Sequence, residues 1–117
     1  MSRHELNTLL DGITGIIQDY RNLNDVLVFE DKETINGMMK NLSSDLFFLS
    51  PYLDDSREDY YRSYMYYIRK GKSSTEAEKR AKNDNPDKRM LEGFLNRANK
   101  VLESMRSNQS FLKKEQQ

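Results

Sequence analysis

Apolar side chains recur in alternating steps of three and four residues along the first part of the chain, and this rhythm predicts helices. The series consists of Leu6, Leu9, Ile13, Ile16, Tyr20, Leu23 and Leu27. Heptad spacing of this kind places apolar side chains on one stripe of an α-helix. Only two prolines and five glycines interrupt the 117 residues, so long helices are possible. We therefore predict an all-α fold of four to five amphipathic helices that carry heptad seams.

The sequence leaves open what covers these seams. The helices of one chain can pack on each other, or the seams of several copies can associate. The regularity from Leu6 to Leu27 favours association between copies, so a homo-oligomer is expected. Gly12 and Gly15 weaken the first helix by about 1 kcal/mol each relative to alanine. They either permit close approach of a neighbouring helix or are simply tolerated.

Local signals predict where the helices of the first half begin and end. Ser2 and Glu5 have the spacing of a capping box, which predicts a helix start near residue 3. Residues 25–29 are the only β-like stretch, and they continue the first helical stripe. Residues 30–34 form a polar break. The apolar side of a second helix then contains Ile35, Met38, Met39, Leu42, Leu46 and Leu49, with Phe47 and Phe48 adding bulk.

Pro51 is expected to stop or kink this second helix, because the residue before a proline avoids the helical region. Residues 54–56 offer N-caps for a third helix that runs to about residue 70, with Gly71 just after its end. The pair Ser73 and Glu76 repeats the capping box and predicts a short fourth helix.

Asn85-Pro86 has the pattern of an N-cap followed by proline at the first helical position, which predicts the start of the last helix. This helix carries an apolar series in steps of three and four up to its final gap, formed by Leu91, Phe94, Ala98, Val101, Met105 and, more weakly, Leu112. Residues 114–117 are expected to fray.

Charge divides the chain into two regions although the net charge is zero. Residues 1–58 hold five basic and eleven acidic side chains, and residues 59–117 hold fourteen basic and eight acidic ones. We therefore predict an acidic N-terminal helical region, 1–50, for assembly or partner docking. A basic helical region, 51–113, is predicted to bind nucleic acid and to form oligomers.

The residue content argues against catalysis. The chain has no cysteine and one histidine, His4, which is expected to be exposed. It lacks a glycine-rich phosphate loop and a nucleophile elbow. The acidic run at residues 54–59 lacks the spacing of a calcium loop and is interpreted as a helix N-terminus. We expect no enzyme activity, metal or cofactor. No stretch is long and apolar enough for a membrane span, no signal peptide is recognised, and a cytoplasmic location is expected.

Five of the seven tyrosines lie between residues 60 and 70, which makes this helix the most informative segment. At 3.6 residues per turn, an apolar stripe is predicted to contain Tyr61, Tyr64, Met65 and Ile68, flanked by Tyr60 and Tyr67. The opposite side is predicted to gather Arg62, Tyr66 and Arg69, with Lys70 adjacent.

A tyrosine ring among guanidinium groups suits single-stranded nucleic acid, because the cations meet phosphates and the ring stacks on a base of any identity. The predicted binding residues are Arg62, Tyr66, Arg69, Lys70, Lys72, Lys79, Arg80 and Lys82. The alternative, a merely solvated basic face, is about as well supported by the sequence.

The segment Asp59–Lys113, about half of the chain, carries a resemblance to a known family. Its tyrosine-rich basic helix is followed by Arg-Lys-Gly-Lys at residues 69–72, by a Ser-Ser-Thr-Glu-Ala helix start at residues 73–77, and by a long amphipathic helix. This order resembles phage recombination mediators of the UvsY type. The acidic N-terminal half has no counterpart in the resemblance.

The resemblance implies that the basic helix binds single-stranded DNA and that the last helix drives assembly into rings. The residues that would build the oligomer are then Leu91, Phe94, Leu95, Ala98, Val101, Leu102 and Met105. It also implies a protein of the phage-infected bacterial cytoplasm that helps load a RecA-like recombinase on strands covered by single-strand-binding protein. It would do so without hydrolysing nucleotide.

Two functions follow from the sequence. The first is a non-enzymatic single-stranded DNA-binding accessory protein of phage recombination or replication. The second is a helical protein-interaction module, such as a phage-encoded adaptor or inhibitor of a host complex, because Tyr, Met and Arg are enriched at protein interfaces.

Overall fold

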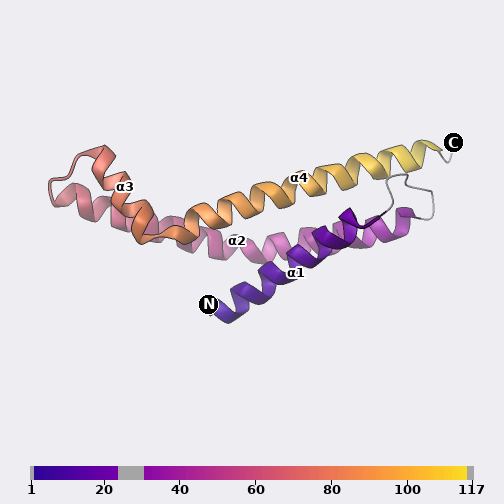
Figure 1. The fold of residues 1–117 in the computed structure, drawn as a ribbon, viewed down its shortest axis with the longest axis horizontal. Coiled ribbons are helices and arrows are strands. Elements are labelled where there is room, and N and C mark those ends of the chain that lie inside the picture. The colour runs from indigo at the N-terminus through magenta and orange to yellow at the C-terminus, as the bar shows by residue number, and fades with distance from the viewer. Residues whose placement is uncertain (1, 24–30, 116–117) are drawn as a thin grey trace. The chain divides into compact units, whose positions relative to one another are not determined.

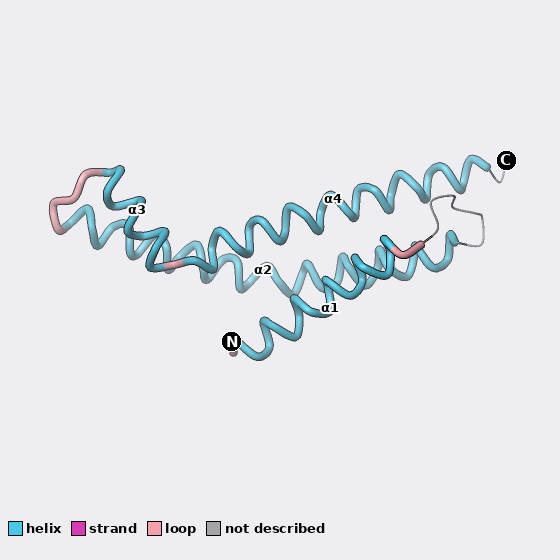
Figure 2. Tube along the Cα trace, in the orientation of Figure 1, coloured by secondary structure: helices cyan, strands magenta, loops and turns pink. Residues whose placement is uncertain are grey.

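The computed structural model describes residues 2–23 and 31–115, with side chains described through residue 112. These residues form four helices and no strand (Figures 1 and 2). The helices are α1 (Arg3–Arg21), α2 (Asp31–Arg69), α3 (Ser74–Asp84) and α4 (Pro86–Glu115). The prediction of an all-α fold is confirmed. The last helix extends through Glu115, so the fraying expected from residue 114 is not seen as far as the structure describes the chain.

The chain packs as two units that differ from the regions expected from charge. Unit 1 comprises Met1–Leu49 and Leu95–Gln117, and unit 2 comprises Ser50–Phe94. The first boundary lies close to the predicted one at residue 50. The second was not foreseen, because α4 is one helix whose first part belongs to unit 2 and whose remainder belongs to unit 1.

This grouping mixes the acidic and basic parts of the sequence. Residues 50–94 hold ten basic and nine acidic side chains, and the two segments of unit 1 together hold nine basic and ten acidic ones. Each unit is therefore almost neutral. The two packed units therefore do not coincide with the acidic and basic regions of the sequence, and any strong positive potential must come from a local cluster.

The core of unit 1 is built from side chains on three helices, and all of them except Leu102 follow one another at intervals of seven residues within their helix. Its buried members are Leu6 and Ile13 of α1, Ile35, Leu42 and Leu49 of α2, and Ala98, Leu102, Met105 and Leu112 of α4. Polar contacts border this core. The Tyr20 hydroxyl lies 2.8 Å from Ser104 Oγ and accepts a hydrogen bond from Asn108 Nδ2. Gln109 Nε2 donates to the Lys32 carbonyl oxygen at 2.7 Å, which joins α4 to the start of α2.

Helix α1 begins as predicted and ends earlier than the apolar series suggested. Ser2 is the N-cap, and its Oγ accepts a hydrogen bond from the Glu5 backbone N–H at 3.1 Å, which confirms the capping box. The helix ends at Arg21, with Asn22 as its C-cap. The β-like stretch 25–29 and Leu27 lie outside the described residues.

The first helix does not need a second copy of the chain to cover it, because Leu6 and Ile13 are buried within the single chain. Close approach does not explain its glycines either. A Cβ built on Gly12 would meet Asp45 Oδ2 at 3.7 Å, which is an ordinary contact, and one on Gly15 would meet nothing within 4 Å. Of the two interpretations left open by the sequence, simple tolerance fits the structure.

Helix α2 passes through Pro51, so of the two outcomes predicted there, a stop or a kink, the stop does not occur. Side chains on both sides of the proline continue one buried stripe, since Leu49 is 1% exposed and Leu53 is 4% exposed. Continued burial of this stripe favours keeping the helix although proline removes one backbone donor. Ser56 is therefore not an N-cap but a buried residue inside the helix, and its Oγ donates to the Leu53 carbonyl oxygen at 2.8 Å.

The same helix corrects two further expectations. Residues 31–34, predicted as part of a polar break, form the first turn of α2. The acidic run 54–59 lies within α2 and is not a helix N-terminus. The sequence-predicted second and third helices are thus one helix of 39 residues, and the described residues contain four helices in place of the upper estimate of five.

The turn between α2 and α3 follows the local signals closely. Gly71 has φ of 89°, the only positive φ among the described residues. Its N–H donates to the Ile68 carbonyl oxygen at 3.0 Å, and the Lys72 N–H donates to that of Tyr67 at 3.1 Å, which together form a Schellman motif. Ser73 caps α3 by accepting from the Glu76 N–H at 3.2 Å. Pro86 is the first residue of α4, as predicted.

Alanine at two glycines is expected to change stability in opposite directions. A Cβ at Gly37, inside α2, or at Gly71 would meet nothing within 4 Å, so the two sites differ mainly in backbone conformation. Gly37→Ala should raise the free energy of unfolding by about 1 kcal/mol through helix propensity. Gly71→Ala should lower it by about 1 kcal/mol, because a side chain is strained at positive φ. Urea unfolding followed by circular dichroism measures both, and equal shifts in one direction would contradict this account.

The residues assigned to oligomerisation lie on α4 and are mostly used inside the chain. Leu91, Ala98, Leu102 and Met105 are buried in the single chain, while Phe94, Leu95 and Val101 are half-buried. The four buried side chains are covered within the single chain and cannot contact a second copy unless this packing opens. Self-association through other surfaces stays a prediction for mass measurement in solution.

Candidate nucleic-acid interface

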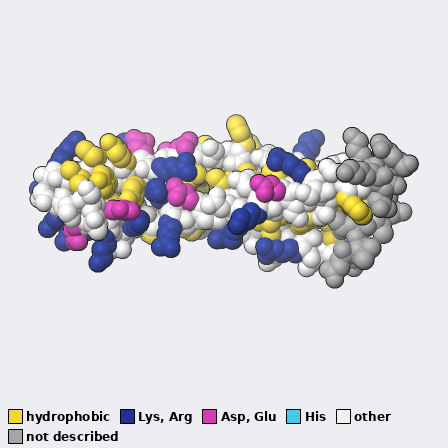
Figure 3. All heavy atoms as spheres, turned by 90° about the horizontal axis from the view of Figure 1, so that it is seen from above, with side chains coloured by type: hydrophobic (Ala, Val, Ile, Leu, Met, Phe, Trp, Pro, Cys, Tyr) yellow, Lys and Arg dark blue, Asp and Glu magenta, His cyan; other side chains and the backbone are white. Residues whose placement is uncertain are grey.

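All eight residues predicted to bind nucleic acid lie in unit 2, and all are exposed. They occupy the last part of α2, the turn after it, and α3. We call residues 62–82 the basic hairpin. It contains seven basic side chains and two acidic ones, Glu76 and Glu78. Figure 3 shows Lys and Arg side chains around α3, at the left of that view, with hydrophobic side chains exposed between them.

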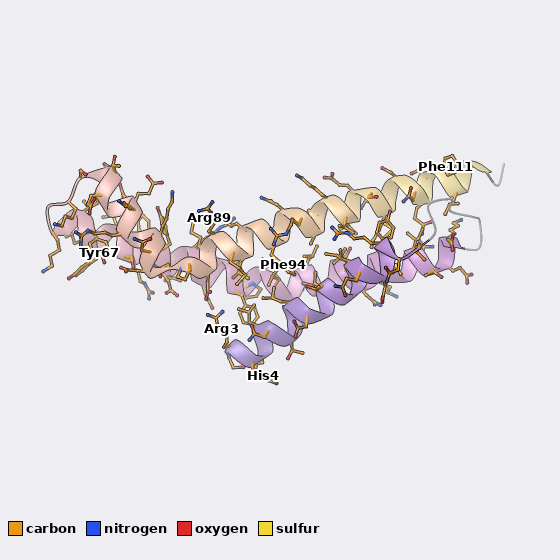
Figure 4. The ribbon with its side chains drawn as sticks, viewed as in Figure 1. Arg3, His4, Tyr67, Arg89, Phe94 and Phe111 are labelled. Atoms are coloured by element: carbon orange, nitrogen blue, oxygen red, sulfur yellow. The ribbon has the colours of Figure 1, made fainter. Side chains whose placement is uncertain are left out.

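Contacts between α2 and α3 hold the hairpin closed. Ala77 and Ala81 on α3 are fully buried. The Tyr67 hydroxyl, from α2, donates to Asp84 Oδ2 at 2.5 Å, and Figure 4 shows Tyr67 beside α3. Asn85 Nδ2 donates to Ser63 Oγ at 2.8 Å and to the Ala81 carbonyl oxygen at 2.9 Å. The basic side chains are thus carried on a braced pair of helices.

The structure separates the basic residues into two rows. Helix α2 meets α3 through Ser63 and Tyr67, whereas helical geometry puts Arg62 and Arg69 on the opposite side of α2. The α2 row therefore contains Arg62, Tyr66 and Arg69, with Lys70 at its end. The α3 row contains Lys79, Arg80 and Lys82, and Lys72 lies in the turn between them. The sequence suggested one continuous stretch, but the fold gives two surfaces of one hairpin.

Several of these cations already have an acidic neighbour on the same helix. Arg62 pairs with Glu58 at 2.6 Å, Arg80 with Glu76 at 2.8 Å, and Lys82 with Glu78 at 3.0 Å. These pairs are exposed, and exposed pairs contribute little to stability, so a phosphate can replace the carboxylate. Within the part of the chain that the structure describes, the remaining basic residues of the hairpin form no ion pair. They are Arg69, Lys70, Lys72 and Lys79.

Two pKa shifts in and beside α3 reflect hydrogen-bonded pairs. The pKa of Glu76 is lowered, mainly by its hydrogen bond from Arg80 and also by the charges of Lys79 and Lys72. The pKa of the Tyr67 hydroxyl is raised, mainly because it donates a hydrogen bond to Asp84. The first shift therefore reports mainly the pair of Glu76 with Arg80, to which Lys79 and Lys72 add smaller contributions.

The aromatic residues of α2 depart from the predicted stripe at one position. Tyr60, Tyr64, Met65, Tyr67 and Ile68 are half-buried. Tyr61, predicted to belong to the same stripe, has 61% of its surface exposed, and Tyr66 has 54% exposed as predicted. The half-buried side of α2 is centred on Tyr60, Ser63 and Tyr67, because those positions meet α3 and α4. No signal in the apolar pattern separated Tyr61 from its neighbours.

Cations lie over several of these rings. Lys70 Nζ is 5.5 Å from the centre of the Tyr66 ring, and the Tyr67 ring meets Tyr66 edge-on with centroids 5.2 Å apart. Arg80 lies 5.7 Å from the Tyr67 ring. These contacts link the two rows through two adjoining rings with a cation at each end, and the two cation–ring contacts each contribute a modest cation–π attraction.

Within unit 2, an ion cluster of three residues joins α2 to the first part of α4. Arg57 Nε donates to Glu92 Oε1 at 3.0 Å, and Lys88 Nζ lies 3.3 Å from the same oxygen. Lys88 also lies 4.8 Å from the centre of the Tyr60 ring. The pKa of Glu92 is below its ordinary value, mainly because of the hydrogen bond from Arg57, with Lys88 adding to it.

We expect this cluster to make part of the free energy of unfolding depend on pH. Because the folded pKa of Glu92 is lower than the unfolded one, its contribution is present above the ordinary value of 4.5 and is lost as pH falls through the folded pKa. Urea unfolding at about pH 6 should show Glu92→Gln less stable than the natural chain by at most about 1 kcal/mol. The gap should close as the pH falls through the folded pKa of Glu92, because the carboxyl of the natural chain is then protonated and its pairing is lost.

The control for this prediction is Glu103→Gln, an exposed glutamate of the same helix without an ion pair to any residue the structure describes. It should not lower stability at either pH. A gap for Glu92→Gln that persists at low pH would mean that the side chain acts by packing.

Other candidate chemistry is not assembled in the described ranges. His4 is exposed in the first turn of α1 (Figure 4), and no group of three or more His, Cys, Asp or Glu residues that could hold a metal ion is found within residues 2–23 and 31–115. None of the four described helices is long and apolar enough to cross a membrane.

The chain matches no protein-family model, no curated protein and no solved structure. The function therefore has to be argued from the hairpin itself.

Proposed function

We propose that this protein is a non-enzymatic, single-stranded DNA-binding accessory protein of phage recombination or replication, and that the basic hairpin is its binding surface. The observation that carries the proposal is the exposure of Arg62, Tyr66 and Arg69 on one side of α2. Exposed side chains on one side of a helix can reach the phosphates of a polyanion, and Arg62 can exchange its exposed pair with Glu58 for such a contact.

The charge of the hairpin sets the expected mode of binding. Its excess of five positive charges lies in a unit that is otherwise slightly acidic, so the potential is local. Each phosphate neutralised releases bound counterions, and affinity then falls with salt at a slope of about −0.7 per contact for a single strand. Base identity should matter little, because cations and ring faces do not read base edges.

Fluorescence anisotropy with labelled oligo-dT tests the proposal. With about four phosphate contacts, raising monovalent salt from about 50 to about 200 mM should weaken binding by about 50-fold. Oligo-dA of the same length should bind with similar affinity. A failure to bind either strand even at the lower salt would refute the proposal.

The role in loading a recombinase is the part of the proposal that rests on the resemblance of residues 59–113. In this role the protein binds strands covered by single-strand-binding protein and helps a RecA-like recombinase to displace it. The assay is the DNA-dependent ATPase rate of such a recombinase on covered strands. The protein should shorten the lag before ATP hydrolysis, and an unchanged lag at saturating protein would remove this role.

A second candidate function is a protein-interaction module, and the exposure of two aromatic side chains in unit 1 favours it. Phe47 is 75% exposed and Phe48 is 60% exposed, and their rings meet edge-on with centroids 5.8 Å apart. Exposed aromatic residues are enriched at protein interfaces. Capture of one stoichiometric partner from bacterial lysate that resists nuclease and is lost in Phe47→Ala with Phe48→Ala would support this function.

A further inference from the structure

Tyr61 is an exposed tyrosine of α2 that the described part of the chain leaves without a partner. It makes no hydrogen bond, ring stack or cation–π contact with any described residue. Tyr66, the other exposed tyrosine of this helix, has Lys70 over its ring and Tyr67 against it. A large aromatic side chain kept in water on a basic surface is a feature of a binding site rather than of a core.

The two tyrosines lie on either side of the arginine row. At about 100° per residue, Arg62 and Arg69 fall between Tyr61 and Tyr66 around the circumference of α2. The tyrosine positions are also separated by about 7.5 Å along the helix axis. A strand that crosses this surface therefore meets a ring, then guanidinium groups, then a second ring.

We propose that an unpaired base of the bound strand stacks on Tyr61 while its backbone passes over Arg62 and Arg69 toward Tyr66. This inference rests on the proposed function, and it names the residue that makes the site prefer single strands. In a duplex both faces of each base are covered by neighbouring pairs, so Tyr61 can contribute only when bases are unpaired. Tyr66 supports the strand with one face already shielded by Lys70.

A variant series at Tyr61 separates stacking from charge. Tyr61→Leu should weaken binding to oligo-dT by about tenfold at fixed salt, because the ring surface for one base is lost. The salt slope should stay unchanged, because no phosphate contact is removed. Tyr61→Phe should bind like the natural protein. Because Tyr61 is mostly exposed, the helical circular dichroism of both variants should be preserved.

An abasic deoxyribose-phosphate strand of the same length is the matched ligand. It should bind the natural protein and Tyr61→Leu equally. The chain has no tryptophan, so Tyr61→Trp provides a single reporter. Its fluorescence should be quenched by oligo-dT and not by the abasic strand, whereas a reporter outside the stack would respond to both alike.

The outcomes for the inference and for the proposed function are distinct. If the natural protein fails to bind oligo-dT at low salt, the proposed function is wrong. If it binds oligo-dT but Tyr61→Leu binds equally well, or loses the same affinity for the abasic strand, the stacking role of Tyr61 is wrong and the function stands.

Discussion

Pro51→Ala is expected to raise the free energy of unfolding by about 2 kcal/mol. Proline inside a helix costs about 3 kcal/mol, because it lacks the N–H that would bond the carbonyl oxygen four residues earlier. That oxygen belongs to Phe47, and alanine at position 51 restores its donor. Alanine also gives the unfolded chain more conformational freedom than proline does, and this reduces the gain in stability by about 1 kcal/mol. The midpoint of thermal unfolding should rise by roughly 6–10 °C.

Ser50→Ala is the matched control for this variant. Ser50 is exposed, adjacent in the same helix and keeps its own N–H, so alanine there should gain only about 0.5 kcal/mol from propensity. Urea unfolding followed by circular dichroism measures both. Equal small gains for the two variants would mean that α2 is interrupted at Pro51 in solution.

Arg62→Ala combined with Arg69→Ala should weaken binding to oligo-dT by about tenfold near 0.1 M salt and make the salt slope shallower by about 1.4. Both side chains are exposed on α2, so their loss should leave the helical circular dichroism unchanged. In the free protein Arg62 forms an ion pair with Glu58. On binding, a phosphate takes the place of the Glu58 carboxylate. Glu58→Gln should therefore move affinity the other way and tighten binding by about two- to threefold.

The control for this double variant removes two positive charges from another part of the chain. Lys100 and Arg106 are exposed on α4 in unit 1, and neither forms an ion pair with a residue in the described ranges. Lys100→Ala with Arg106→Ala changes net charge equally and should leave the salt slope unaltered. If both double variants weaken binding alike, the protein binds DNA by overall charge, and the hairpin has no special role.

The parts of the fold that could be predicted depend on a few neighbouring residues. The capping boxes at Ser2 and Ser73 and the αL turn at Gly71 were predicted from the sequence, because their hydrogen bonds join groups within three to five positions. The exposure of the eight residues predicted to bind nucleic acid was expected for a similar reason. Charged side chains on the polar side of a helix stay in water unless another element covers them.

The errors came from competition between local and distant contacts. Pro51 is a local signal for a break, but burial of Leu49 and Leu53 on one stripe outweighs it, and this burial depends on elements far away in the sequence. Tyr61 was misplaced because periodicity gives the width of an apolar stripe without its centre. The centre is set by where α3 and α4 meet α2, through Tyr67 and Tyr60.

The sequence by itself determined that the described residues are helical, that Ser2 and Ser73 cap helices, that Gly71 forms a turn, and that residues 62–82 carry a dense positive charge. These properties follow from backbone hydrogen bonds and side-chain chemistry within a few residues. The tertiary structure alone decided that the later part of α4 packs with the N-terminal segment, that four apolar side chains predicted to form an oligomer seam are buried within the chain, and that Tyr61 is left in water. Which apolar surface is covered depends on how distant helices pair, and helices with similar heptad stripes offer several partners of nearly equal free energy.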